Sequence, residues 1–254
     1  MSEEPQHHIQ CKTGDVGRYV LLPGDPARSK KIADHFDEAW KVTENREYVT
    51  YTGKVNDILV SVTSTGIGCP AATIAVEELS KIGADTFIRV GTTGGMDPSV
   101  SRDIIIATAA IRSDGASKEY VPTEYPAVAD HNIVSALIEA SKKMGIKPKI
   151  GVVWTHDSYY RGTSIKVCPD VTEIVKPWLT AGVMSVENEA AGIFIVSSVR
   201  RKRAGCILAC AGNILSRKEE EFSEEVLDKL VDDEIRIAME AVKILDTWEK
   251  EGRI

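Results

Sequence analysis

The sequence predicts a single α/β domain, because short apolar strands alternate with helices along the whole chain. No linker, internal repeat or low-complexity segment divides its 254 residues. Hydrophobic residues make up 43% of the sequence, which is enough for a sizeable core, and charged residues make up 27%, as is ordinary for a soluble protein. We therefore expect residues 1–254 to fold as one unit around a central β-sheet.

The composition argues against several classes of protein. The formal net charge of -7 at pH 7 comes without an offsetting basic stripe, so nucleic acid is not expected as a partner. No apolar run reaches the ~18 residues that a membrane span needs, and the acidic N-terminus lacks an apolar signal region. The five cysteines form no CxxC pair and no zinc ligand set with histidine, which favours a reduced, cytoplasmic protein without structural disulfides.

The first strand and helix predict a site for an anion. Arg18–Gly24 is typical of a strand that ends in a turn, after which Asp25 can cap a helix that opens with Pro26. A strand, a glycine and a helix N-terminus together present main-chain N–H groups to an anion. Arg28 in the first helical turn opposes the helix dipole, and this placement favours ligand binding over a solvated arginine.

The remaining elements follow in the same alternation, after a polar, irregular arm that carries His7 and His8. Turn residues and apolar spacing predict strands at Tyr48–Val55, Ile58–Thr65, Asp103–Arg112, Ile150–Trp154, Gly182–Val186 and Cys206–Ala211. The first two form a hairpin around Asn56-Asp57. Helical spacing predicts helices at Ala71–Ile82, Asn132–Met144, Ala190–Ser198 and Glu224–Trp248. The charged stretch Arg217–Glu221 is expected to be a mobile flap.

A central strand is expected at Phe87–Val90, followed by a turn over Gly91–Gly95. Glycine lets the main chain of this turn approach a ligand closely, and Thr92 and Thr93 add hydroxyl groups. Arg89 interrupts the apolar strand with a charge that needs a partner in a core. Two interpretations remain open here: Arg89 binds an anionic ligand at the end of the strand, or it pairs with a structural carboxylate.

Two carboxylates and two aromatic residues stand at other strand ends. Glu187 and Glu189 precede the helix at Ala190–Ser198, where acidic residues are favoured by the helix dipole alone. Because neighbouring side chains face opposite ways, only one of the two is expected to reach a shared ligand. Tyr159 and Tyr160 lie in a predicted polar loop, where they can wall an aromatic ligand or simply pack.

Taken together, these stretches resemble the nucleoside phosphorylase family, and most closely its uridine phosphorylase branch. The resemblance covers nearly the whole chain and rests on Leu22–Arg28, Asn45–Tyr48, Ser64–Gly68, Ala75–Leu79, Ile88–Gly94, Arg112–Ser117, Tyr125–Asp130 and Val186–Gly192. It implies a central mixed, distorted barrel-like sheet flanked by helices. It also implies a pentosyltransferase of nucleoside salvage, in which a nucleoside and phosphate give the free base and ribose 1-phosphate. Inorganic phosphate is then a co-substrate, and no cofactor is expected.

The resemblance also implies roles for individual residues. The phosphate would be held by Gly24, Arg28, Arg46, Arg89 and Thr92, and the ribose by His8, Glu187, Asn188 and Glu189. The base would be contacted by Thr93, Gly94, Tyr159, Thr163, Lys166 and Asn213, with Arg89, Glu189 and Asn213 as the catalytic set. Arg46 and His8 would act in the site of a neighbouring subunit, within a homo-hexamer built as a trimer of dimers. No metal is expected in the chemistry, although some relatives hold a potassium ion near the residue that matches Glu47.

The end of the site that binds the base departs from the family pattern. Uridine phosphorylases read uracil with a glutamine and an arginine, and the matching positions here are Thr163 and Ile165, with Lys166 adjacent. Hexameric purine enzymes place an acidic aspartate where this chain has Asn213, which can donate a hydrogen bond but cannot deliver a proton. Asn188 stands where a methionine usually packs against the ribose.

These departures leave several activities open. The first choice is phosphorolysis of uridine, and the alternative within the same chemistry is phosphorolysis of inosine or guanosine. A hydrolytic nucleosidase is a further class, but it needs no anion clamp of the kind that Arg28, Arg46 and Arg89 would form. An inactive nucleoside-binding protein on the same fold is the last class, which Arg89 and Glu189 argue against.

Overall fold

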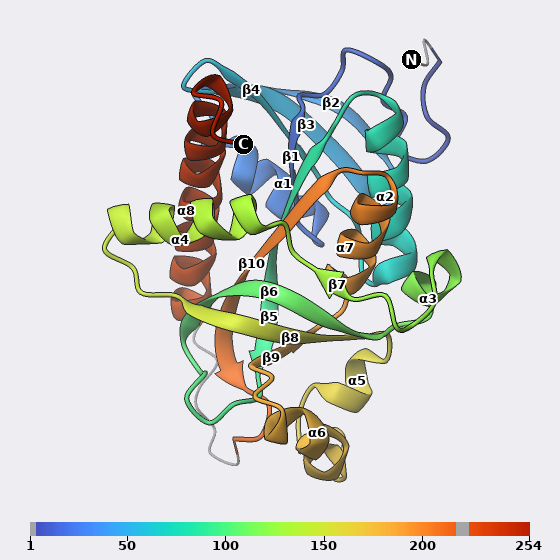
Figure 1. Ribbon diagram of the computed structural model, residues 1–254, viewed down its shortest axis with the longest axis vertical. Coiled ribbons are helices and arrows are strands. Elements are labelled where there is room, and N and C mark those ends of the chain that lie inside the picture. The colour runs from blue at the N-terminus through green and yellow to red at the C-terminus, as the bar shows by residue number, and fades with distance from the viewer. Residues whose placement is uncertain (1–3, 217–223) are drawn as a thin grey trace.

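Strand β5 (Thr86–Gly95) is the centre of the sheet in the computed structural model, which describes residues 4–216 and 224–254 (Figure 1). Strand β10 (Arg203–Asn213) runs parallel to β5 along its whole length. On the other edge of β5, β1 (Tyr19–Leu22) pairs in parallel with the first half and β9 (Ser185–Glu187) pairs antiparallel with the end. The predicted turn at Gly91–Gly95 is therefore wrong, because β10 pairs with β5 through this stretch and β9 pairs with its last two residues, Gly94 and Gly95.

The sheet is mixed, and part of it closes on itself. Strands follow the order β10-β6-β8-β9-β5, and the pairing of β10 with β5 completes the ring. From β5 the sheet continues through β1, β4, β3 and β2. The bounds of the strands not yet given are β2 Glu38–Asn45, β3 Tyr48–Val55, β4 Ile58–Thr63, β6 Asp103–Ser113, β7 Ala127–Val128 and β8 Lys149–His156. The expected α/β fold with a mixed, barrel-like sheet is confirmed.

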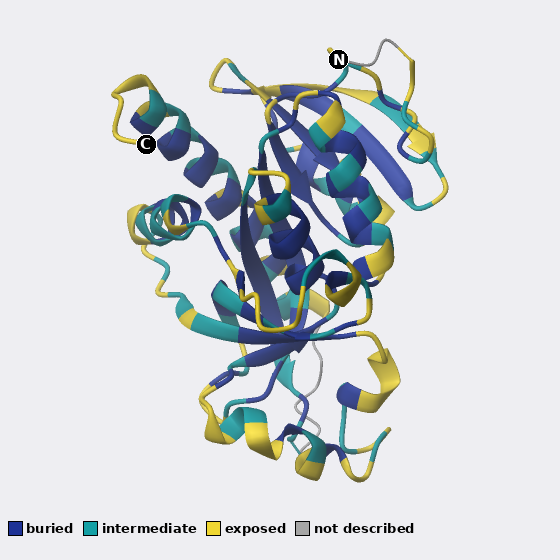
Figure 2. Ribbon diagram, turned by 45° about the vertical axis from the view of Figure 1, so that its right-hand side comes forward, coloured by how far each residue is buried: buried dark blue, intermediate teal, exposed yellow. Residues whose placement is uncertain are grey.

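Helices cover the sheet on two sides. The bounds are α1 Pro26–Ala33, α2 Cys69–Lys81, α3 Ala116–Tyr120, α4 His131–Lys143, α5 Tyr159–Gly162, α6 Val171–Thr180, α7 Ala190–Val199 and α8 Glu224–Lys250. Helices α4 and α8 pack together on one side, and α2 and α7 on the other (Figure 1). Figure 2 shows the buried positions gathered on the strands and on the helix faces turned toward them.

The alternation of side chains along the strands separates two cores. Phe87 belongs to the cluster on the side of α2 and α7, whereas Ile88 and Val90 belong to the cluster on the side of α4 and α8. By the same period of two, Arg89 shares a face with Phe87. The guanidinium of Arg89 therefore points toward the start of α7.

Several local predictions are confirmed and a few are wrong. Asp25 caps α1 by accepting a hydrogen bond from the amide of Ala27 at 2.9 Å, and the hairpin turns at Asn56-Asp57 with both residues at positive φ. The expected loop after β8 contains the short helix α5, and neither β2 nor α6 was predicted. The stretch expected to be a flap begins at residue 217 and lies outside the described residues.

Candidate active site

The edge of β5 that faces β1 and β9 has a gap. The register of β1 ends at the pair of Leu22 with Arg89, and that of β9 begins at the pair of Val186 with Gly94. Since β10 takes the opposite edge throughout, residues 90–93 have no strand beside them on this edge within the described chain. Main-chain groups freed in this way are available to a ligand at the carboxyl ends of β1 and β5.

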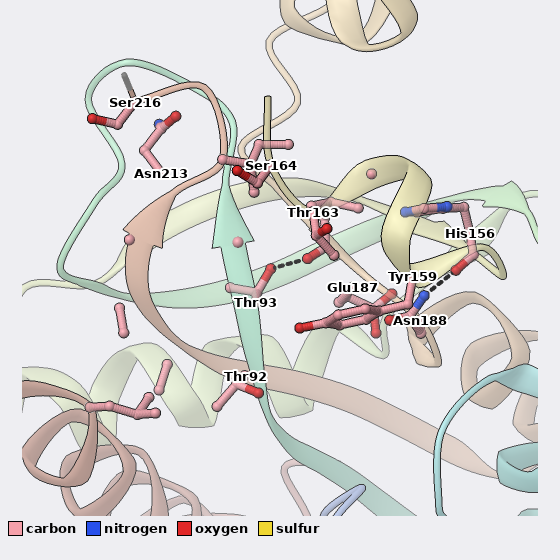
Figure 3. Close-up of a pocket in the computed structure, with 18 of the residues that line it drawn as sticks. Thr92, Thr93, His156, Tyr159, Thr163, Ser164, Glu187, Asn188, Asn213 and Ser216 are labelled. Carbon is pink, nitrogen blue, oxygen red and sulfur yellow. Dashed lines mark hydrogen bonds between the residues drawn. The ribbon is translucent and has the colours of Figure 1, made fainter. Parts of the chain in front are cut away.

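A cavity of about 680 Å³ opens beside this gap. Its size is that of a site for a small organic ligand. Strands β5, β8, β9 and β10, the segment around α5 and helix α8 contribute its walls (Figure 3). The residues that line it include Thr92, Thr93 and Gly94 of β5, His156, Tyr159, Thr163, Ser164 and Lys166 around α5, Glu187 and Asn188 of the β9–α7 junction, Ala209 and Asn213 of β10, and Leu227 of α8.

Behind one wall of the cavity, Arg89 is buried between two carboxylates. Its Nε donates to Glu187 at 2.9 Å, and its Nη2 lies 2.5 Å from Glu189. The premise that the two carboxylates face opposite ways is wrong, because both contact Arg89, whereas which of them reaches a ligand stays a prediction. Glu187 ends β9 and accepts hydrogen bonds from the amides of Glu189 and Ala190, so the chain turns between the two carboxylates and both face Arg89.

One donor of Arg89 is left over. Its Nη1 is buried and has no hydrogen-bond partner among the described residues. Leaving a buried donor unpaired costs about 1–3 kcal/mol, and more when the donor is charged. An anion in the neighbouring gap would satisfy this donor. Of the two interpretations of Arg89 that the sequence left open, pairing with a structural carboxylate is confirmed, and binding of an anionic ligand stays a prediction that the free donor permits.

The electrostatic environment follows from this burial. Burial alone would lower the pKa of Arg89, but Glu189 and Glu187 outweigh it and raise that pKa. Burial raises the pKa of Glu189 above its ordinary value, against the opposing effect of Arg89, and the nearby Glu187 adds to the rise. Glu189 also accepts a hydrogen bond from the amide of Gly68 at 2.6 Å.

The turn after β1 is tied to the same cluster. The carbonyl of Gly24 accepts a hydrogen bond from the amide of Gly66 at 2.9 Å, and Gly68 continues from there to Glu189. A Cβ on Gly24 would lie 3.2 Å from the carbonyl oxygen of Gly66, so the close approach favours glycine. Arg28 is half-buried in the first turn of α1, and no described carboxylate lies within ion-pair distance of it. Gly24 and Arg28 thus offer main-chain and guanidinium groups on the β1 side of the gap.

Residues 18–246 match the model of the family described as "Phosphorylase superfamily". The chain belongs to the phosphorylase superfamily. It is 45% identical to a protein named uridine phosphorylase from Treponema pallidum over 97% of this chain and 96% of that protein. It is 44% identical to a uridine phosphorylase from Thermococcus kodakarensis over 98% and 90% of the two chains. A guanosine phosphorylase from Halorubrum lacusprofundi is 34% identical over 96% of this chain and 100% of that protein.

Among the residues expected at the base in this phosphorylase-superfamily chain, Asn213 is already occupied. Its amide donates to the carbonyls of Asp97 and Val100 at 2.8 and 3.0 Å, and its Oδ1 accepts from the amide of Leu215. Asn213 lines the cavity but has no free N–H for a ligand, which contradicts the expectation that it reads a base as a donor. Thr163 differs, because its buried hydroxyl has no partner among the described residues.

His156 was not predicted as a site residue from the sequence. This residue ends β8 and lines the cavity, with its ring stacked on Trp154 at a centroid distance of 4.2 Å. Burial lowers the pKa of His156 below its ordinary value, against Asp157 and Glu187, so the ring is neutral near pH 7. Its position at the end of a strand, three residues before Tyr159, was the available signal.

The other expected residues lie at different places. Thr93 donates to the carbonyl of Val186 at 2.7 Å, and Asn188 donates to the carbonyl of His156. The ring of Tyr159 faces the cavity, whereas Tyr160 is 72% exposed and does not line it. Figure 3 shows Thr92 and Thr93 on β5, with Tyr159 and Asn188 on the other side of the cavity.

Arg46, His8 and Glu47 do not line the cavity of this chain. Arg46 is exposed in the turn between β2 and β3, and His8 is held by Glu78 at 2.7 Å from its Nδ1. Within residues 4–216 and 224–254, no group of three or more His, Cys, Asp or Glu side chains is placed to hold a metal ion. In the same part of the chain, no helix is long and apolar enough to span a membrane. All five cysteines are free thiols.

Proposed function

We propose that the protein is a uridine phosphorylase, which converts uridine and phosphate to uracil and ribose 1-phosphate. The observation that carries this proposal is Arg89, whose free Nη1 lies at a gap in the sheet between the glycine turn of β1 and the carboxylates of the β9–α7 junction. The uridine phosphorylases among the relatives, which match nearly the full chain, support the choice of substrate.

Phosphate would occupy the gap beside β5. Arg89 through Nη1, Arg28, Thr92 and the main chain at Gly24 can donate to it. An oxygen of the phosphate then forms the bond to C1′ of the ribose as the bond from C1′ to the base breaks, and the base leaves with the electron pair of that bond. Holding the anion at a fixed distance from C1′ can lower the barrier by several kcal/mol.

The ribose would lie between the phosphate and the β9–α7 junction. Glu189 can accept hydrogen bonds from the 2′- and 3′-hydroxyl groups, and Glu187 and Asn188 border the same space. Arg89 contacts Glu189 and also borders the proposed phosphate position. This one side chain therefore connects the residue that would bind the ribose to the phosphate that would attack it. Binding energy away from the broken bond can thus orient the reacting atoms.

The uracil would lie in the outer part of the cavity. Tyr159 can stack on it, while Thr93, Gly94, Thr163 and Lys166 surround it. The neutral ring of His156 carries one hydrogen-bond donor and one acceptor. The edge of uracil carries N–H donors and carbonyl acceptors, so either nitrogen of the ring can find a partner there. His156 and the free hydroxyl of Thr163 are therefore the groups that we assign to the base, in place of Asn213.

The assembly we propose is a cytoplasmic homo-hexamer, a trimer of dimers, acting in nucleoside salvage. Arg46 and His8 would reach the site of the neighbouring subunit, which accounts for their place outside the cavity of their own chain. Potassium near Glu47 is a proposal for the interface between these subunits, and no other cofactor is proposed.

Guanosine phosphorolysis is the second candidate, supported by the relative of that name. The deciding experiment measures release of free base from uridine, inosine and guanosine, each with and without phosphate. Turnover of uridine only with phosphate is the expected result, and an exposed variant, Tyr160→Phe, should retain it. Phosphate-dependent turnover of guanosine alone would overturn the choice of base, and turnover without phosphate would overturn the reaction.

A further inference from the structure

The long helix α8 carries a buried acid on its apolar stripe. Glu234 is 0% exposed and lies between Val231, Ile235 and Ala238 of the core. Neither of its carboxyl oxygens has a hydrogen-bond partner among the described residues. A carboxylate in such a place is costly, and an apolar side chain of similar size would fill the same space without that cost.

Glu234 lies behind the wall of the cavity on the β5–β10 side. Leu227, which lines the cavity, is seven residues earlier and so lies on the same face of α8. Ala209 also lines the cavity, and its main chain is one of the groups that stabilise the charged form of Glu234. In the register of the sheet, Ala209 lies beside Thr92, which is assigned to the phosphate.

The ionisable groups that act on Glu234 come from helix α1 and strands β5 and β10. They are Arg28 and Lys31 of α1, Arg89 of β5 and the thiol of Cys206 in β10. Lys31 is 3.1 Å from Asp228 of α8, and Arg89 is shared by Glu187 and Glu189. Arg28, the cation that most favours ionisation of Glu234, has no carboxylate within ion-pair distance among the described residues. Arg28 and Arg89, the two arginines that this chain would contribute to its own phosphate site, are thus also the two arginines that lower the pKa of Glu234.

Burial raises the pKa of Glu234 to about 8, because it outweighs Arg28, Arg89, the main chain of Ala209 and Lys31. Near neutral pH the group is therefore a neutral acid in the empty site. A phosphate anion at Arg28 and Arg89 would raise this pKa further, since like charges disfavour ionisation. Burial and the neighbouring acids hold the pKa of Cys206 well above its ordinary value, so this thiol stays protonated over the same range.

We propose that Glu234 is the charge-compensating group of the phosphate site. It is protonated whenever phosphate is bound, and its carboxylate takes the place of phosphate as the counter-ion of Arg28 and Arg89 when the site is empty at alkaline pH. Each phosphate that binds under alkaline conditions is accompanied by one proton, which passes from solvent to the Glu234 carboxylate. The inference rests on the proposed phosphate site, and it adds that phosphate binding there is coupled to protonation of Glu234.

The sign of the effect follows from linkage. Below pH ~8 Glu234 is protonated in both states, and phosphate affinity does not depend on it. Above that pH the carboxylate must be protonated before phosphate binds, so the affinity falls by up to about tenfold per pH unit. Inorganic phosphate is already a dianion in this range, and titrating it without nucleoside keeps the ionisation of the base out of the measurement.

The test is calorimetric titration of the protein with inorganic phosphate at pH 7 and pH 9, in buffers of different ionisation enthalpy. For the wild-type protein we expect the number of protons taken up per phosphate bound to approach one at pH 9. The value at pH 7, where Glu234 is already protonated, reports only the ionisation of phosphate itself and serves as the baseline. Glu234→Gln keeps the shape of the neutral acid, and should bind phosphate without proton uptake and about tenfold more tightly than wild type at pH 9. Glu240→Gln replaces a partly exposed acid of α8 that pairs with Lys143 and Lys243, and this control should behave as wild type in the phosphate titration.

The wild-type titration decides the matter even if Glu234→Gln does not fold. Phosphate binding without proton uptake at pH 9 would overturn this inference and leave the proposed function standing. Proton uptake that persists in Glu234→Gln would assign the coupling to another group and also overturn it. If the wild-type protein binds no phosphate and shows no phosphate-dependent turnover, the proposed function fails as well.

Discussion

Arg89 and Glu189 form a buried ion pair, 2.5 Å between Nη2 and Oε2, although one comes from the middle of β5 and the other from the start of α7. The pair joins the gap beside β5 to the junction that borders the cavity. Glu187 completes it from the end of β9. A change in any of the three side chains therefore alters both the stability of the junction and the proposed sites for phosphate and ribose.

Arg89→Ala should destroy more than phosphate binding. Removing the guanidinium leaves two buried carboxylates without their cation, which costs about 3–5 kcal/mol of unfolding free energy. Arg89→Lys retains the charge but not the planar fork, so it should unfold closer to wild type while its phosphate KM rises. Denaturant unfolding and phosphate-dependent kinetics measure the two effects. A near-normal phosphate KM in a folded Arg89→Lys protein would count against Arg89 as a phosphate ligand.

Glu189→Gln tests the ribose contact. The amide has nearly the shape of the carboxylate, but it loses the charge that strengthens hydrogen bonds from the sugar hydroxyls. We expect kcat/KM for uridine to fall by about 10- to 100-fold, the range of one charged hydrogen bond. The loss should be smaller with 2′-deoxyuridine, which has already lost one of the two hydroxyls. Equal losses with both nucleosides would show that Glu189 does not contact the 2′-hydroxyl.

Gly162→Ala tests the place of His156 in the cavity. A Cβ on Gly162 would lie 2.3 Å from Nε2 of His156, so the imidazole must move. The helical conformation of α5 itself tolerates alanine. We expect KM for the nucleoside to rise severalfold while phosphate affinity is unchanged. Gly115→Ala is the control, because a Cβ there meets Asp157 only at an ordinary 3.6 Å. An unchanged KM in Gly162→Ala would exclude the ring from base binding.

His156 also predicts a pH dependence of stability. Burial lowers its pKa in the folded protein, so the unfolded chain binds more protons below the ordinary histidine pKa of ~6.5. The contribution of His156 is fully present above that pH and is lost as the pH falls toward the folded pKa. The free energy of unfolding should therefore drop more steeply between pH 7 and pH 5 in wild type than in His156→Gln. Parallel curves for the two proteins would contradict this assignment.

The fold was more predictable than the site, and particular residues show why. The cap at Asp25 and the turn at Asn56-Asp57 are local, so the sequence predicted them. The course of Gly91–Gly95 depends on β9 and β10, which approach from distant parts of the chain, and local composition indicated a turn instead.

Within the site, it was easier to predict which residues take part than which groups those residues contact. The sequence singled out Arg89, Glu187 and Glu189, but not that both carboxylates face the same guanidinium. It also predicted a free donor on Asn213, which the main chain of a neighbouring loop takes up. The burial of Glu234 was not predicted, because in the sequence an acidic residue within an amphipathic helix is typical of a solvent-exposed position. Only the packing of α8 against the sheet shows that this side chain is buried.

Sharing of sites between subunits predicts recovery of activity in mixed oligomers. Glu189→Ala disables the site of its own chain, whereas Arg46→Ala removes a side chain that is exposed in its own chain and would serve the neighbour. In a dimer of one chain of each kind, one of the two sites has both residues intact. With random exchange, about a quarter of all sites are then complete, because half of the dimers are mixed. Activity should rise toward this fraction when the two inactive proteins are mixed, and labelled subunits must show that exchange has occurred. Exchange without any recovery would mean that Arg46 does not act across the interface.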